Sequence, residues 1–297
     1  MALVILYGAR RILNDIISQS AQGIVPNLVG PAHVGPGAPN VMSLIAHCGD
    51  HKSFEVLFDK IDAELWHIML TPAALYDMCR TFPRRILDNV WSAEPRQNFY
   101  TAEHPVTGGT AWHAAAENPH LEMMLVLGDA ARGLINNVDA NNQTALFSAV
   151  AADNIDKVES LSDYGINASH ALADGTTAVH RAAYLRNENS CKILKFLLPL
   201  VPFDISAGTQ AGTILHTLIW GLRDSVYHPG VPEMPYNKLL FITEEVEDEL
   251  IEKTKEFCKA ILYQGADRRA LNAGGMRPFD LAVLFGFEEI GAMIMPD

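Results

Sequence analysis

One seven-residue pattern occurs five times in this 297-residue chain, and it limits the folds that the chain can adopt. Four copies begin with Thr and the last begins with Arg277, and small or aliphatic residues follow. The first two steps, from Thr110 to Thr144 and from Thr144 to Thr177, are 34 and 33 residues. The copies occupy residues 110–116, 144–150, 177–183, 213–219 and 277–283. A period of this length predicts similar units that each pack on their neighbours.

The copies resemble the T-P-L-H-x-A signature of the ankyrin repeat, in which a β-turn precedes two antiparallel helices. Thr110 is suited to cap a helix, because its hydroxyl can accept a backbone N–H of the first turn. The residue two before each cap is Gly108, Asn142, Gly175, Ala211 or Gly275. Gly and Asn tolerate positive φ at low cost. We therefore expect a turn tip in every copy, with Gly212 replacing Ala211 through a shifted turn.

The resemblance implies an all-α ankyrin solenoid of helix-turn-helix units with short β-turn fingers. We predict ankyrin repeats over residues 107–297, degenerate ankyrin-like helical units over 41–106, and a capping helix with a Pro- and Gly-rich loop over 1–40. The span from Thr213 to Gly265 is 52 residues, whereas the matching span from Thr144 to Gly165 is 21. We place this insertion at about residues 223–248. A helix with one apolar face is predicted after Thr243, through Val246, Leu250, Thr254, Phe257 and Ile261.

Three histidines, His113, His180 and His216, share one position of the repeat. Neighbouring repeats place this position about 10 Å apart, which is too far for shared metal coordination. The resemblance implies instead that each imidazole bonds within its own turn and helix. His47, Cys48 and His51 form the nearest approach to a reactive cluster, and no fourth ligand accompanies them.

Sequence motifs for serine hydrolases, P-loops and zinc proteases are absent from the chain. We therefore expect no catalytic residue, no metal, no cofactor and no enzymatic activity. The net charge of −13 argues against nucleic acids and anionic membranes as partners. Four cysteines without a C-x-x-C pair indicate free thiols in a reducing compartment. Without a membrane-spanning stretch, we expect a cytoplasmic monomer.

The resemblance implies a protein-binding module or scaffold whose concave surface is made by turn tips and first helices. The family's contact positions fall on Glu117, Asn118, Asn141, Asn142, Gln143, Asp174, Thr176, Arg181, Tyr184, Leu185 and Gln210. In the insertion, Tyr227, Met234 and Tyr236 must pack on the solenoid or meet a partner. We expect these to add to the binding surface.

Two alternatives remain open at this stage. Residues 1–106 would carry an enzymatic or modifying activity that the repeats direct to a target, although their helical, Pro-broken composition argues against this. Divergent ankyrin arrays with insertions also occur in effectors that intracellular bacteria deliver into the host cytoplasm, and in eukaryotic scaffolds. The sequence does not separate these two settings.

Overall fold

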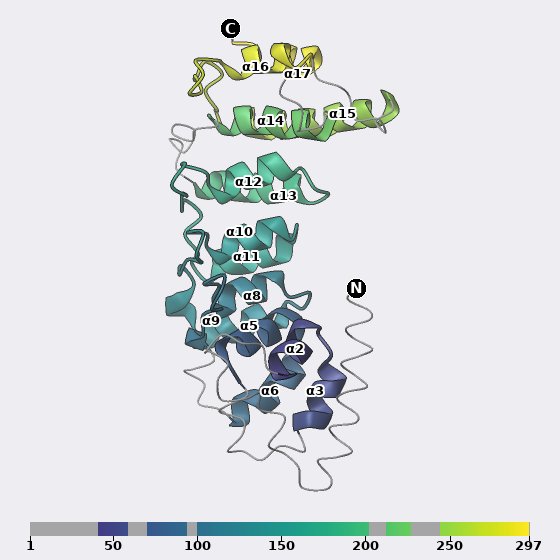
Figure 1. Cartoon of the computed structure of the whole chain (residues 1–297). Coiled ribbons are helices and arrows are strands. Elements are labelled where there is room, and N and C mark those ends of the chain that lie inside the picture. The colour runs from purple at the N-terminus through teal and green to yellow at the C-terminus, as the bar shows by residue number, and fades with distance from the viewer. Residues whose placement is uncertain (1–40, 59–69, 94–99, 202–211, 227–243, 297) are drawn as a thin grey trace, which may run out of the picture. The chain divides into compact units, whose positions relative to one another are not determined.

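The computed structural model describes residues 41–58, 70–93, 100–201, 212–226 and 244–296 (Figure 1). Within these ranges the chain forms helices and turns, with isolated β-bridges in place of strands. The predicted all-α class is therefore confirmed. No helix in the described part of the chain combines the length and apolar character that crossing a bilayer requires. The predicted N-terminal helix and loop of residues 1–40 lie outside the described ranges, and the predicted division into domains stays a prediction.

The chain separates into two units, Met1–Ala145 and Leu146–Asp297. The first unit contains α2 (Val41–His47), α3 (His51–Phe58), α5 (Pro72–Thr81), α6 (Arg84–Ala93), α8 (Ala111–Glu117), α9 (Glu122–Ala130) and the short 3-10 helix η1 (Arg132–Leu134). Helix α2 packs on α5, and α5 packs on α8, so these three helices form one row. Thr71 caps α5 by accepting the Ala74 N–H at 3.3 Å, with Pro72 at the first helical position.

The second unit contains α10 (Ala145–Ala151, which begins at the boundary), α11 (Ile155–Asp163), α12 (Ala178–Leu185), α13 (Ser190–Leu197), η2 (Leu198–Leu200), α14 (Ile214–Val226), α15 (Glu244–Tyr263), α16 (Pro278–Leu284) and α17 (Glu288–Ile294). The first helices α12, α14 and α16 pack in one layer, and the second helices α11, α13, α15 and α17 pack in another (Figure 1). Two layers of antiparallel helices are the arrangement that the repeat predicts.

The turn that precedes each first helix has the backbone conformation predicted for it. The residue at the predicted tip has φ of 65° at Gly108, 59° at Asn142, 83° at Gly175 and 72° at Gly275. Gly212 has φ of 99° and takes the left-handed position, as expected, beside Ala211, which is outside the described residues. Backbone bonds close the turns, for example from Asp139 N to Gln143 O at 2.9 Å and from Leu172 N to Thr176 O at 2.8 Å. We call the closed turns 139–143, 172–176 and 272–276 fingers.

The insertion alters both helices of its repeat. Helix α14 continues to Val226, so residues 223–226 extend the first helix, and residues 227–243 lie outside the described ranges. Thr254, Phe257 and Ile261 of α15 are buried, as predicted, but Val246 is 42% exposed. Helix α15 has 20 residues, whereas α13 has eight and α17 has seven, so its first turns extend past the helices on which it packs.

A methyl group on Gly221 should destabilise the second unit. A Cβ at this position of α14 would overlap the carbonyl oxygen of Tyr184 in α12 and lie 3.0 Å from its Cα. Overpacking of this kind costs about 1–3 kcal/mol, although alanine by itself favours a helix over glycine. Urea denaturation of Gly221→Ala should therefore show a lower midpoint than the unmodified chain. Gly133→Ala is the control, because its Cβ would meet nothing within 4 Å. An unchanged or higher midpoint for Gly221→Ala would contradict this packing.

Candidate functional site

The finger of residues 139–143 presents its tip to solvent on a fixed backbone. The Asp139 carboxylate accepts the N–H groups of Asn141 at 2.9 Å and Gln143 at 2.8 Å. Asn141 and Asn142 are exposed, and Gln143 is half-buried. Asp139 and the left-handed Asn142 stabilise the turn. The backbone at the tip is therefore already ordered, and a partner that binds the tip side chains does not need to order it.

In the finger of residues 172–176, the predicted contact residue Asp174 stabilises the turn itself. The Asp174 carboxylate accepts the Thr176 N–H at 2.8 Å while the Asp174 side chain remains exposed. Thr176 is half-buried. Asp174 therefore shapes the finger as well as presenting charge on it.

The repeated histidines join the fingers to the first helices. Nδ1 of His113 lies 2.9 Å from Thr110 Oγ1 and accepts the Thr110 N–H at 3.1 Å. On the other side of the ring, Nε2 lies 2.8 Å from the carbonyl oxygen of Gln143. Since a carbonyl only accepts, Nε2 carries the proton and the ring is neutral. The expected structural role of this histidine is confirmed.

The same contacts recur in two further copies, with one difference. His216 Nδ1 lies 2.9 Å from Thr213 Oγ1, and His216 Nε2 lies 2.9 Å from the carbonyl oxygen of Met276. His180 Nδ1 lies 2.9 Å from Thr177 Oγ1, but His180 Nε2 is buried without a hydrogen-bond partner among the described residues. Burial lowers the pKa of all three imidazoles, and it lowers the pKa of His180 to about 4.

The last copy replaces this pair with an ion pair. The Asp280 carboxylate accepts the Arg277 N–H at 3.0 Å and the Arg277 guanidinium at 2.9 and 2.7 Å. Hydrogen bonds from Arg277 lower the pKa of Asp280 to about 2. The helix start is thus capped from the same two positions by different chemistry.

The exposed face of α12 continues onto α14 through polar and aromatic contacts. Tyr184, which is 41% exposed, donates its hydroxyl to Asp224 at 2.7 Å, and this hydrogen bond raises the pKa of Tyr184. The Arg223 guanidinium also binds the Asp224 carboxylate and lies 4.5 Å from the centroid of the Trp220 ring. Arg181, another predicted contact residue, is half-buried on the same helix as Tyr184.

We define the α12–α14 face as Arg181, Tyr184, Leu185, Trp220, Arg223 and Asp224. Sequence reasoning identified its α12 members and missed those on α14. Their signal is the helical pattern that continues past Ile219, and the predicted start of the insertion at about residue 223 falls inside this helix. Leu185 is half-buried on this face.

Asn118 was predicted to contact a partner, and the structure shows that this prediction is wrong. It is fully buried, and its amide donates to the carbonyl oxygens of Cys79 at 2.6 Å and Phe82 at 3.0 Å. Its oxygen accepts the His120 N–H at 2.8 Å. Asn118 therefore ties the end of α8 to the end of α5 and has no surface to offer a partner. Its neighbour Glu117 is exposed, as a contact residue requires.

Four predicted contact residues lie outside the described ranges, and their assignment stays a prediction. They are Gln210, Tyr227, Met234 and Tyr236.

His47 and His51, the two histidines that flank Cys48, lie on different helices. Helix α2 ends at His47, Gly49 has φ of 68°, and α3 begins at His51, so no continuous helix joins the two histidines. His47 Nδ1 lies 3.3 Å from an Asp77 carboxylate oxygen and 3.3 Å from the Arg80 guanidinium. Across the described ranges, His, Cys, Asp and Glu side chains form no group of three suited to a metal ion.

A comparison with known protein families identifies part of the chain. A family model described as ankyrin repeats, in three copies, matches residues 113–207. The match begins within the copy that starts at Thr110, and it spans the copies at Thr144 and Thr177 together with the 139–143 and 172–176 fingers. No curated protein matches the chain.

We predict that stability falls as the pH falls because of the buried histidines. In the unfolded chain His180 has the ordinary pKa of 6.5, whereas in the folded chain its pKa is about 4. Between these values the unfolded state binds more protons, so the free energy of unfolding decreases from about pH 7 towards pH 4. For His180 alone the loss is about 2 kcal/mol between pH 7.5 and pH 5.

The variant His180→Gln should reduce this loss by about that amount, because glutamine keeps a capping side chain and does not titrate. Urea denaturation at pH 7.5 and pH 5 measures the difference. His120→Gln is the matched control, since His120 is exposed. If His180→Gln and the unmodified chain lost equal stability on acidification, His180 would not be held neutral by burial.

Proposed function

This chain is an ankyrin-repeat protein, and we propose that it acts as a non-enzymatic module that binds a partner protein. Repeats of this kind form extended surfaces from finger tips and first helices. The first unit presents one proposed binding surface, made of Glu117 and the exposed tips of the 139–143 finger. The second unit presents another, made of the 172–176 finger and the α12–α14 face.

The observation that carries the proposal is that the α12–α14 face contains Tyr, Trp and Arg side chains that are held in place by contacts with one another and with Asp224. Tyr, Trp and Arg are the residue types that contribute most to protein–protein binding. Here Tyr184 and Arg223 are both held by Asp224, and Arg223 lies over Trp220. Side chains that are already ordered lose little conformational entropy when a partner binds.

The setting of this binding follows from charge and packing. A net charge of −13 disfavours nucleic acid as the partner, and we propose a protein partner bound by a cytoplasmic monomer.

Because α2, α5 and α8 pack in one row, we propose that residues 41–106 are degenerate repeats of the same array. This row favours a binding role over a separate catalytic domain in this segment.

Partner capture should depend on Tyr184. Loss of a central aromatic contact weakens a protein interface by about 2 kcal/mol or more, which is more than tenfold in affinity. We expect Tyr184→Ala to lower partner recovery at least tenfold when the full chain is used as bait in a cell lysate and recovery is quantified by mass spectrometry. Asn142→Gly, which keeps the left-handed turn and removes the tip amide, should give a smaller loss.

Glu159→Ala serves as the control, because Glu159 is exposed on α11 in the second-helix layer. The same proteins should be recovered with this variant as with the unmodified chain. Equal recovery with Tyr184→Ala and Glu159→Ala would rule out the α12–α14 face as the binding surface.

A further inference from the structure

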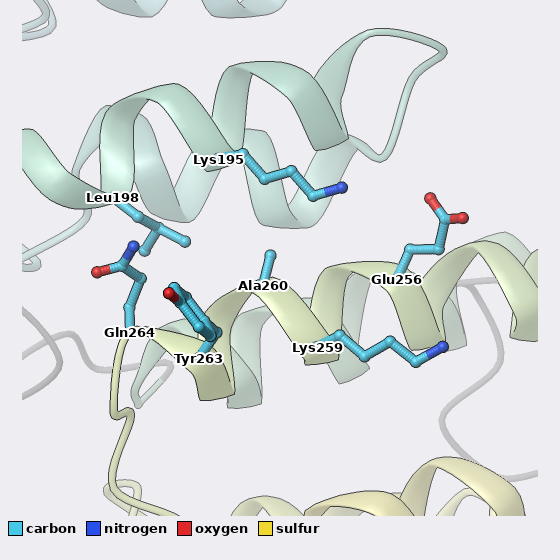
Figure 2. Close-up of a pocket in the computed structure, with 7 residues that line it drawn as sticks. All are labelled: Lys195, Leu198, Glu256, Lys259, Ala260, Tyr263 and Gln264. Atoms are coloured by element: carbon cyan, nitrogen blue, oxygen red, sulfur yellow. The ribbon is translucent and has the colours of Figure 1, made fainter.

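The two helix layers of the second unit differ in how closely their helices pack. Between the second helices α13 and α15 lies an open groove of about 520 Å³, beside Lys195, Ala260 and Tyr263 (Figure 2). Between the first helices α12 and α14 the backbones approach so closely that no Cβ fits at Gly221. Polar groups in such a contact need partners within the protein, because water does not reach them. One of these groups is the side chain of Arg186, which follows the last residue of α12.

The Arg186 guanidinium is buried and bonds to α14. The residue is 6% exposed. Its Nη2 donates to the carbonyl oxygen of Gly221 and to the Ser225 hydroxyl. Ser225 Oγ in turn donates to the Gly221 carbonyl oxygen at 3.1 Å. One nitrogen atom at the end of α12 therefore binds two successive turns of α14.

This placement of Arg186 is unfavourable in three respects. Its backbone has φ of 48°, a left-handed conformation that glycine adopts more easily after a helix. Burial lowers the pKa of the guanidinium to about 10, which reflects the removal of its charge from water. Nε and Nη1 are buried without a hydrogen-bond partner in the described part of the chain. A glycine here would avoid all three, so the capping of α12 does not by itself account for an arginine at this position.

The bonds of Arg186 fall near the end of α14, which is the longest of the first helices of this unit that the structure describes. Helix α14 has 13 residues, whereas α12 has eight and α16 has seven. Carbonyl groups near the C-terminus of a helix carry partial negative charge, so a cation bound there stabilises the last turn. Residues 223–226 form this last turn, and it carries Arg223 and Asp224 of the α12–α14 face.

Asp224 connects this last turn to α12. Its carboxylate accepts the Tyr184 hydroxyl at 2.7 Å and the Arg223 Nε–H at 2.8 Å, and Arg223 lies over the Trp220 ring. If the turn unwound, Asp224 would move away from Tyr184, and Arg223 would move away from Trp220. The order of these side chains thus depends on a turn that Arg186 binds.

We propose that Arg186 is a positioning residue for the α12–α14 face. Its buried side chain acts by keeping residues 223–226 helical, so that Asp224 orders Tyr184 and Arg223. The effect of Arg186 on binding rests on the proposed function, whereas its effect on the last turn of α14 is measured on the chain alone.

Hydrogen–deuterium exchange of the full chain, followed by mass spectrometry, tests the effect on α14. In Arg186→Gly the amides of residues 223–226 should exchange at least tenfold faster than in the unmodified chain, because the turn loses its cation. The amides of residues 214–219 should be unchanged, and the variant should fold, because glycine suits the left-handed backbone. Glu188→Gly is the matched control, since Glu188 is exposed two residues further along the same loop, and it should exchange as the unmodified chain does.

The indole N–H resonance of Trp220, assigned with Trp220→Phe, tests whether the face loses its order. Arg223→Ala removes the guanidinium from the ring and gives the reference chemical shift. In Arg186→Gly the resonance should move towards this reference, whereas a role confined to capping α12 would leave it unchanged. Partner recovery from a cell lysate should fall at least threefold with Arg186→Gly, since the partner must then order Tyr184 and Arg223 itself.

Unchanged exchange at residues 223–226 in Arg186→Gly, or a Trp220 resonance that does not move, would overturn the positioning role. An equal response of Glu188→Gly would overturn it as well. Recovery that falls with Tyr184→Ala and not with Arg186→Gly would remove Arg186 from the binding function. If exchange and the Trp220 resonance change as expected while recovery is insensitive to both variants, the ordering by Arg186 stands and the proposed binding role of the face fails.

Discussion

The contact between the capping threonine of a repeat and the histidine three residues later positions the finger tips and first helices, which carry the proposed binding residues. In the copies at Thr110 and Thr213, one imidazole caps the first helix through Nδ1 and contacts the base of the following finger through Nε2. Both contacts require a neutral ring, and burial keeps it neutral. In each of these two copies, a single side chain therefore fixes the first helix relative to the finger that follows it.

The copies that lack this arrangement show what it contributes. Arg277 and Asp280 replace it with an ion pair on the surface, which still caps the helix. In the second copy Phe147 stands three residues after Thr144, and it has no acceptor atom. The Thr144 hydroxyl is accordingly buried without a partner among the described residues. A capping threonine without its histidine thus leaves a buried polar atom unsatisfied, at a cost of about 1–3 kcal/mol.

Sequence predicted the features that depend on local chemistry. Positive φ at the turn tips follows from Gly and Asn, and the structural role of His113 was implied by the resemblance to ankyrin repeats. Asn118 could not be assigned correctly, because its burial depends on where α5 ends and exposes the carbonyls of Cys79 and Phe82. Trp220, Arg223 and Asp224 were missed because they join the candidate surface only when α14 continues to Val226. The exposure of Val246 depends likewise on the lengths of the neighbouring helices.

The missing side chain of Gly221 also has a geometric consequence. The backbones of α12 and α14 approach so closely there that no Cβ fits, while a groove of about 520 Å³ separates α13 from α15 in the other layer. The step between these two helix pairs is therefore a wedge, narrow at the first helices and wide at the second.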